Sequence, residues 1–108
     1  MTLNPHYRSI CERALKAWGT EKQVDMMIEE IGELLSALGK CKRGRTKTGP
    51  VVEELADLQI VLWQMIILFG EDHVKKHIDE KIKRTEAKIE EREREKQKVK
   101  SDDEVHLY

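Results

Sequence analysis

Apolar residues along this chain recur every three or four positions, the period of an α-helix, in four successive segments. The helices expected from them run from Pro5 to Gly19, from Thr20 to Gly39, from Thr48 to Phe69 and from about Asp72 onward. The pattern therefore predicts an all-α protein with a four-helix bundle-like domain.

Residues that favour helix caps and turns mark the ends of these segments. Asn4 followed by Pro5 suits the N-cap and first turn of the first helix. Thr20 and Gln23 have the spacing of a capping box, in which two side chains satisfy backbone N–H groups at the start of a helix. Residues 39–49 are rich in glycine and basic side chains and contain almost nothing apolar, so they are expected to form a loop.

The third segment is apolar around its whole circumference. From Leu58 to Phe69 nearly every residue is apolar, and a helix of this kind must be covered on all sides. One small domain can hardly provide that cover. We therefore expect a homo-oligomer, either a homodimer or a homotetramer.

The fourth segment carries only a thin apolar stripe, and its continuation, EEREREKQKVKSDDE, has no apolar face. Charged sequence of this kind cannot bury enough apolar surface to order itself against a core. We expect residues 1–98 to form the domain and residues 99–108 to form a charged, flexible tail.

Composition narrows the class of protein further. A chain of 108 residues has the size of one domain, and 38% charged residues favour solvated helices. Cys11 and Cys41 lack the spacing of a zinc or disulfide framework, which favours a reducing, cytoplasmic location. No apolar run reaches the ~18 residues of a membrane span. The net charge of −1 and the small basic surface also disfavour a nuclease or nucleic-acid binder.

Four carboxylates occupy positions where a bundle helix meets its neighbour. Glu30 and Glu33 fall on one strip of the second helix, and Glu54 and Asp57 fall on one strip of the third. If these helices pack as an antiparallel pair, the two acidic pairs meet. Acidic residues at such spacings also occur on ordinary solvated helix faces, which is the alternative without any site.

The absence of basic neighbours favours a metal site over a solvated face. No Lys, Arg or His lies between Val24 and Gly39, and none lies between Gly49 and Asp72. Like charges brought together repel, and a hard divalent cation with oxygen ligands offsets that repulsion. Mg²⁺ is the expected cofactor, with Mn²⁺ as the alternative, because Mg²⁺ accepts carboxylates while it retains water and phosphate oxygens.

A basic segment joins the two acidic helices. It contains Lys40, Lys42, Arg43, Arg45 and Lys47. Cations beside a Mg²⁺ site suit a polyphosphate, whose oxygens accept charge-assisted hydrogen bonds, although a basic surface loop is the ordinary alternative. Lys81 and Arg84 could reach the same phosphates or simply form ion pairs, and Trp18 could stack on a nucleobase or pack in the core.

The motifs EEIGE (Glu29 to Glu33) and EELAD (Glu53 to Asp57) resemble the EExxE and ExxD motifs of the MazG-like all-α nucleoside triphosphate pyrophosphohydrolases. The similarity extends from about Trp18 to Phe69 and covers roughly half of the chain. Two such motifs in this order, on successive helices, are fairly specific for this family. The chain looks like a short, stand-alone form, since nothing in it corresponds to the second domain of tandem members.

This resemblance implies an oligomeric helical bundle that binds Mg²⁺ and hydrolyses a (d)NTP to the monophosphate and pyrophosphate. It implies Glu30, Glu33, Glu54 and Asp57 as metal ligands and as part of the catalytic site. Glu29 is implied as a general base or as an acceptor outside the ligand shell, and Glu53 has no matching role.

Two other functions remain open. The first is phosphoribosyl-ATP pyrophosphohydrolase, a relative in the same superfamily with similar acidic helices. The second is a non-catalytic helical module for oligomerisation or partner binding, in which the long charged fourth helix carries the function. Of the three functions, only the two pyrophosphohydrolase activities require a metal site.

Overall fold

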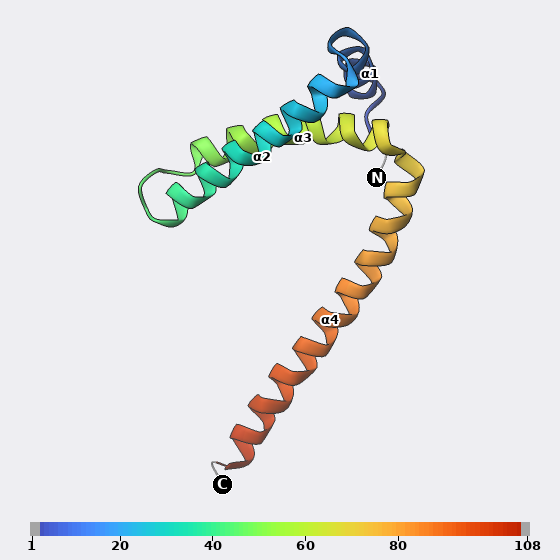
Figure 1. Ribbon diagram of the computed structural model, residues 1–108. Coiled ribbons are helices and arrows are strands. Elements are labelled where there is room, and N and C mark those ends of the chain that lie inside the picture. Colours follow the sequence, from blue (N-terminus) through green and yellow to red (C-terminus); the bar gives the residue numbers. More distant parts are fainter. Residues whose placement is uncertain (1–2, 107–108) are drawn as a thin grey trace. The chain divides into compact units, whose positions relative to one another are not determined.

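The computed structural model describes the backbone of residues 3–106 and the side chains of residues 3–101. The described chain is entirely helical: α1 (Pro5–Trp18), α2 (Thr20–Lys42), α3 (Gly49–Phe69) and α4 (Glu71–His106), with no strand in residues 3–106 (Figure 1). The all-α class predicted from the apolar period is confirmed. Of the expected tail, only Leu107 and Tyr108 lie outside the described residues.

The start of α1 follows the sequence prediction. The side-chain oxygen of Asn4 accepts hydrogen bonds from the backbone N–H groups of His6 and Tyr7, at 2.8 and 3.3 Å. These are two of the donors that the first turn of a helix leaves without an internal partner. Gly19, with φ 90°, then ends α1 and lets the chain turn directly into α2.

The capping box predicted at Thr20 and Gln23 is wrong. Gly19 occupies the N-cap position of α2, and no side chain caps this end of the helix. Gln23 is instead buried, and its side-chain amide donates a hydrogen bond to the side-chain oxygen of Gln64 on α3. A partner 41 positions away along the chain has therefore displaced the local bond.

The expected loop at residues 39–49 is too long. Helix α2 continues through Lys42, and α3 begins at Gly49, so residues 43–48 connect them. Gly39 does not stop α2, because its carbonyl accepts a hydrogen bond from the Arg43 N–H and the helical pattern continues. The chain turns at Gly44 instead, where φ is 73°.

The described residues up to Glu71 form one compact unit, in which α2 and α3 run side by side in opposite directions and α1 packs against both (Figure 1). The apolar core of its described part is small. It consists of Cys11, Ala14, Ala37, Val61 and Met65. At one end Arg8 of α1 forms an ion pair with Glu71. The close pairing of α2 with α3 is what positions the acidic residues.

The described residues from Asp72 onward form a second unit, which consists of the remainder of the 36-residue helix α4 through His106. Its side chains are exposed or half-buried throughout the part described. Pairs such as Lys75 with Asp79, at 3.0 Å, lie along its surface. The helix continues through the expected boundary between residues 98 and 99, and the flexibility of the tail stays a prediction.

No helix in the described part of the chain combines the length and the apolar character needed to cross a membrane. This agrees with the expectation drawn from the lengths of the apolar runs.

Candidate metal centre

Three of the four predicted ligands come together between α2 and α3. Glu30, Glu33 and Glu54 each offer a carboxylate oxygen, and these oxygens lie within 4.8 Å of one another. The spacing explains the meeting: Glu30 and Glu33 are three residues apart and share one side of α2. The antiparallel α3 then presents Glu54 to them from the facing helix.

Two carboxylate oxygens of this cluster are buried but take part in no hydrogen bond. One oxygen of Glu30 and one of Glu54 are buried and have no hydrogen-bond partner in the structure. Buried polar groups normally have a partner, because leaving one without it costs free energy. A positively charged or hydrogen-bonding group beside Glu30 and Glu54 would remove that cost.

No cation of the described chain supplies that group. The ion pairs among the described side chains join Arg8 to Glu71, Lys75 to Asp79 and Arg92 to Glu95. None of them includes a member of the cluster. This matches the absence of basic residues from the acidic stretches of both helices.

The pKa values respond to this crowding. Burial, reinforced by the negative charges of Glu33, Asp57 and Glu54, raises the pKa of Glu30 to about 7. Burial and the neighbouring Glu33 likewise raise the pKa of Glu54. Both carboxyl groups therefore hold protons more tightly than an ordinary glutamate. A bound cation would reverse this preference and favour the charged forms.

Asp57, the fourth predicted ligand, is exposed and is not one of the three residues whose oxygens converge. It lies close enough for its charge to raise the pKa of both Glu30 and Glu54. Glu29 and Glu53 are exposed as well. The structure thus gives a triad with Asp57 beside it, and no role is visible for Glu53.

The basic side chains lie beyond one end of the cluster. Lys40, Lys42, Arg43, Arg45 and Lys47 are all exposed. Because α2 extends through Lys42, Lys40 is helical and lies seven residues, about two turns, after Glu33 on the same side of the helix. Lys42 points about 160° away from Lys40 around the helix axis. Lys40 is therefore the basic residue of α2 best placed to face a ligand of the acidic cluster.

The remaining candidates for substrate contact differ in their surroundings. Core packing, the alternative weighed for Trp18, is wrong, because 61% of this residue is exposed at the end of α1. Its availability for stacking stays a prediction. Lys81 and Arg84 are exposed on α4, in the second unit, and their proposed contacts with phosphate stay predictions as well.

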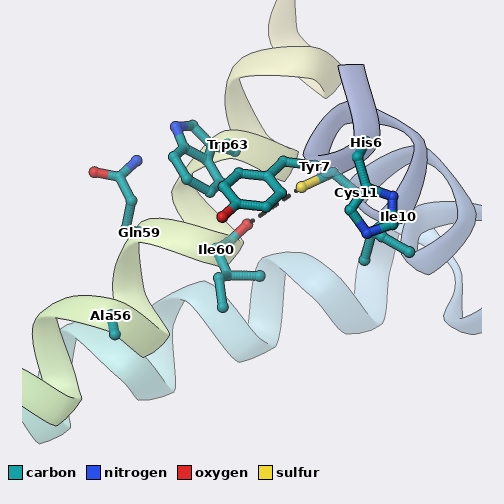
Figure 2. Close-up of a pocket in the computed structure, with 8 residues that line it drawn as sticks. All are labelled: His6, Tyr7, Ile10, Cys11, Ala56, Gln59, Ile60 and Trp63. Atoms are coloured by element: carbon teal, nitrogen blue, oxygen red, sulfur yellow. Dashed lines mark hydrogen bonds between the residues drawn. The ribbon is translucent and has the colours of Figure 1, made fainter. Parts of the chain in front are cut away.

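A separate cavity of about 470 Å³ lies between α1 and α3 (Figure 2). Tyr7 and Trp63 line it, with ring centroids 5.5 Å apart, and the Cys11 thiol donates a long hydrogen bond of 3.8 Å to the carbonyl of Ile60. Trp63 belongs to the apolar stretch from Leu58 to Phe69, and nothing in the sequence connected it with Tyr7. Their separation of 56 positions leaves no local signal for such a pair.

Comparisons of the chain with models of protein families, with curated proteins and with solved structures found no match. The functional case therefore depends on the chain's own residues.

Proposed function

We propose that this protein is a Mg²⁺-dependent pyrophosphohydrolase that cleaves a (d)NTP to the (d)NMP and pyrophosphate. The observation that carries the proposal is the meeting of Glu30, Glu33 and Glu54, whose oxygens lie within 4.8 Å of one another. Two buried carboxylate oxygens without partners support it. The likeness of EEIGE and EELAD to the MazG-like motifs supplies the reaction.

The donor set fits Mg²⁺ by its chemistry. Carboxylate oxygens are the ligands that a hard divalent cation prefers, and Mg²⁺ commonly takes few of them while it keeps sites for water and phosphate. Oxygens around one octahedral Mg²⁺ ion lie about 3 to 4 Å apart, given bonds of about 2.1 Å. Glu30, Glu33 and Glu54 approach this separation, and Asp57 would be the next residue to join them. Mn²⁺ suits the same oxygens.

When bound, Mg²⁺ supplies positive charge to the phosphate oxygens and lowers the pKa of a coordinated water molecule. The chain's own residues orient the substrate around it. Lys40 and the basic side chains of residues 43–47 would hold the polyphosphate through charge-assisted hydrogen bonds. Glu29, exposed on α2 four residues before Glu33, would accept the proton of the attacking water.

The proposed cleavage adds water across one phosphoanhydride bond. The water oxygen forms a bond to the α-phosphorus, and the bond from that phosphorus to the bridging oxygen breaks. Pyrophosphate leaves with the bonding electrons, and the basic side chains offset the negative charge that develops on it. Trp18 would stack on the base, and a homo-oligomer in the cytoplasm is part of the same proposal.

A product analysis with a matched pair of variants tests this function. The full chain is incubated with each NTP, each dNTP and phosphoribosyl-ATP in the presence of Mg²⁺, and the products are separated by chromatography. Monophosphate and pyrophosphate are expected from at least one common nucleotide. Glu54→Gln should abolish this turnover, whereas Glu53→Gln, at the exposed neighbouring carboxylate, should retain it.

Other outcomes point elsewhere. Release of orthophosphate and a diphosphate would contradict the cleavage position. Turnover of phosphoribosyl-ATP alone would identify the related biosynthetic hydrolase. If no nucleotide reacts and Mg²⁺ binds equally to the chain and to Glu54→Gln in calorimetry, no metal site exists, and the non-catalytic helical module is the better explanation.

A further inference from the structure

The cavity between α1 and α3 lies on the side of α3 that faces away from the acidic cluster. Its lining residues on α3 are Ala56, Gln59, Ile60 and Trp63. At about 100° per residue, these four lie roughly 140° to 240° around the helix axis from Glu54. The cavity is therefore separate from the proposed metal centre, and the proposed function makes no use of it.

Both walls of this cavity carry large apolar side chains that the described chain leaves uncovered. Tyr7 and Ile10 on α1 are 50% and 43% exposed, and Ile60 on α3 is 47% exposed. The thiol of the buried Cys11 donates its hydrogen bond to the Ile60 carbonyl, so the thiol is not free to bind a ligand. Single exposed apolar residues are common, but several gathered around one hollow are typical of a binding site.

The rings of Tyr7 and Trp63 favour a flat, aromatic ligand. Their centroids are 5.5 Å apart and their planes differ by 31°, and Figure 2 shows the two rings side by side. A ligand ring inserted between two rings would need about 7 Å, twice the carbon–carbon contact distance of about 3.5 Å. The ligand would therefore stack on the outer surface of this pair, as planar rings do on aromatic side chains.

The polar groups of the lining suit an uncharged ligand. No lysine, arginine, aspartate or glutamate lines the cavity, and the exposed His6 is the only lining residue able to carry a positive charge. The Gln59 side chain is half-buried and forms no hydrogen bond with another described residue. Its amide offers a donor beside an acceptor. Such an amide pairs with an acceptor and a donor that are adjacent on the edge of a heteroaromatic ring, as in adenine.

We propose that this cavity binds an uncharged, planar heteroaromatic molecule of one or two fused rings, stacked on Tyr7 and Trp63 and paired with the Gln59 amide. Its volume of about 470 Å³ falls within the roughly 300 to 1,000 Å³ of small-molecule sites. Eight residues line it, whereas a protein interface of standard size takes about 20 to 30 residues from each partner. The proposal does not depend on the metal centre, because no proposed metal ligand lines the cavity.

Tryptophan fluorescence tests the proposal, with adenine as the probe. Trp18→Phe leaves Trp63 as the single tryptophan of the full chain, so adenine stacked on Trp63 should quench the emission saturably in buffer without Mg²⁺. In this background, Gln59→Leu should weaken adenine binding roughly tenfold, because the paired hydrogen bonds are lost. Tyr7→Leu should weaken it at least roughly fivefold, because the stacking surface is lost.

Glu54→Gln is the matched control, since it changes the opposite side of α3, and it should leave the affinity for adenine unchanged. Cyclohexanol, which is uncharged but not planar, should not compete with adenine. Circular dichroism checks that each variant is folded. Absent quenching at millimolar adenine, equal binding of cyclohexanol, or tighter binding of AMP than of adenine would each overturn the proposal. So would an unchanged affinity in both Gln59→Leu and Tyr7→Leu. Absent quenching together with a lower solution mass of Ile60→Glu would assign the cavity to a second copy of the chain instead.

Discussion

The buried hydrogen bond between Gln23 and Gln64 offers a quantitative test of the packing of α2 against α3. Each residue is only 3% exposed, and the side-chain amide of Gln23 donates to the side-chain oxygen of Gln64. Replacing Gln23 by Met keeps the length and shape of the side chain but removes the donor. The oxygen of Gln64 is then buried without a partner, which costs about 1 to 3 kcal/mol.

The double variant should behave differently from the two single variants. With Gln23→Met and Gln64→Met together, both polar groups are gone and two thioethers of similar volume face each other, so the free energy of unfolding should return close to the wild-type value. If each single variant loses about 1 to 3 kcal/mol, the expected coupling between the two sites is therefore roughly 2 to 6 kcal/mol. In thermal unfolding, each kcal/mol corresponds to roughly 4 to 8 °C for a unit of this size.

The four proteins are compared by urea and thermal unfolding, followed by circular dichroism at one fixed protein concentration, since any association changes the apparent stability. Single variants that lose less than about 0.5 kcal/mol would mean that water satisfies the remaining amide. Strictly additive losses in the double variant would show that the two amides do not interact. Either result would refute the assignment of this bond as a contact between α2 and α3.

Three further predictions concern titration and thiol reactivity. The pKa of Glu30 is raised in the folded chain to about 7. The contribution of Glu30 to stability is therefore fully present below the ordinary glutamate pKa of about 4.3 and is lost as the pH rises through 7. Mg²⁺ should restore the melting temperature at pH 8, and Glu30→Gln should remove this dependence of the melting temperature on pH. Arg8 lowers the pKa of Glu71, so this pair stabilises the fold above the ordinary glutamate pKa and loses its effect as the pH falls through the lowered value. Arg8→Met should reduce the loss of melting temperature at acidic pH, and an unchanged loss would contradict the pairing. Ellman's reagent should react quickly with the half-buried Cys41 and slowly with Cys11, whose pKa is raised by burial, and equal rates in the native protein would show that Cys11 is accessible.

Local signals in the sequence predicted the ends of most helices. Asn4, Pro5 and Gly19 act through their own backbone or side-chain chemistry, so their effects can be recognised without the rest of the fold. Gln23 could not be assigned in this way. Its spacing from Thr20 suited a cap, but the buried partner on α3 offered a bond that no local window contains.

The sequence predicted the acidic cluster only as far as it predicted the packing of α2 against α3. Helical period places Glu30 beside Glu33, and pairing with α3 brings Glu54 to them. The period alone cannot say how far each helix is rotated, and Asp57 consequently lies beside the triad rather than within it. The sequence left two alternatives open for Trp18 for a related reason, because it does not show that the small unit has too little core to cover every aromatic ring.

The two acidic helices are consecutive in the chain, with only residues 43–48 between them. Closing so short a loop costs little conformational entropy, and contacts between near neighbours in sequence form fast. The folding chain therefore meets the mutual repulsion of its carboxylates early, while the pair of helices is still assembling. A divalent ion or a proton present at that moment would act on the rate of folding as well as on the finished protein.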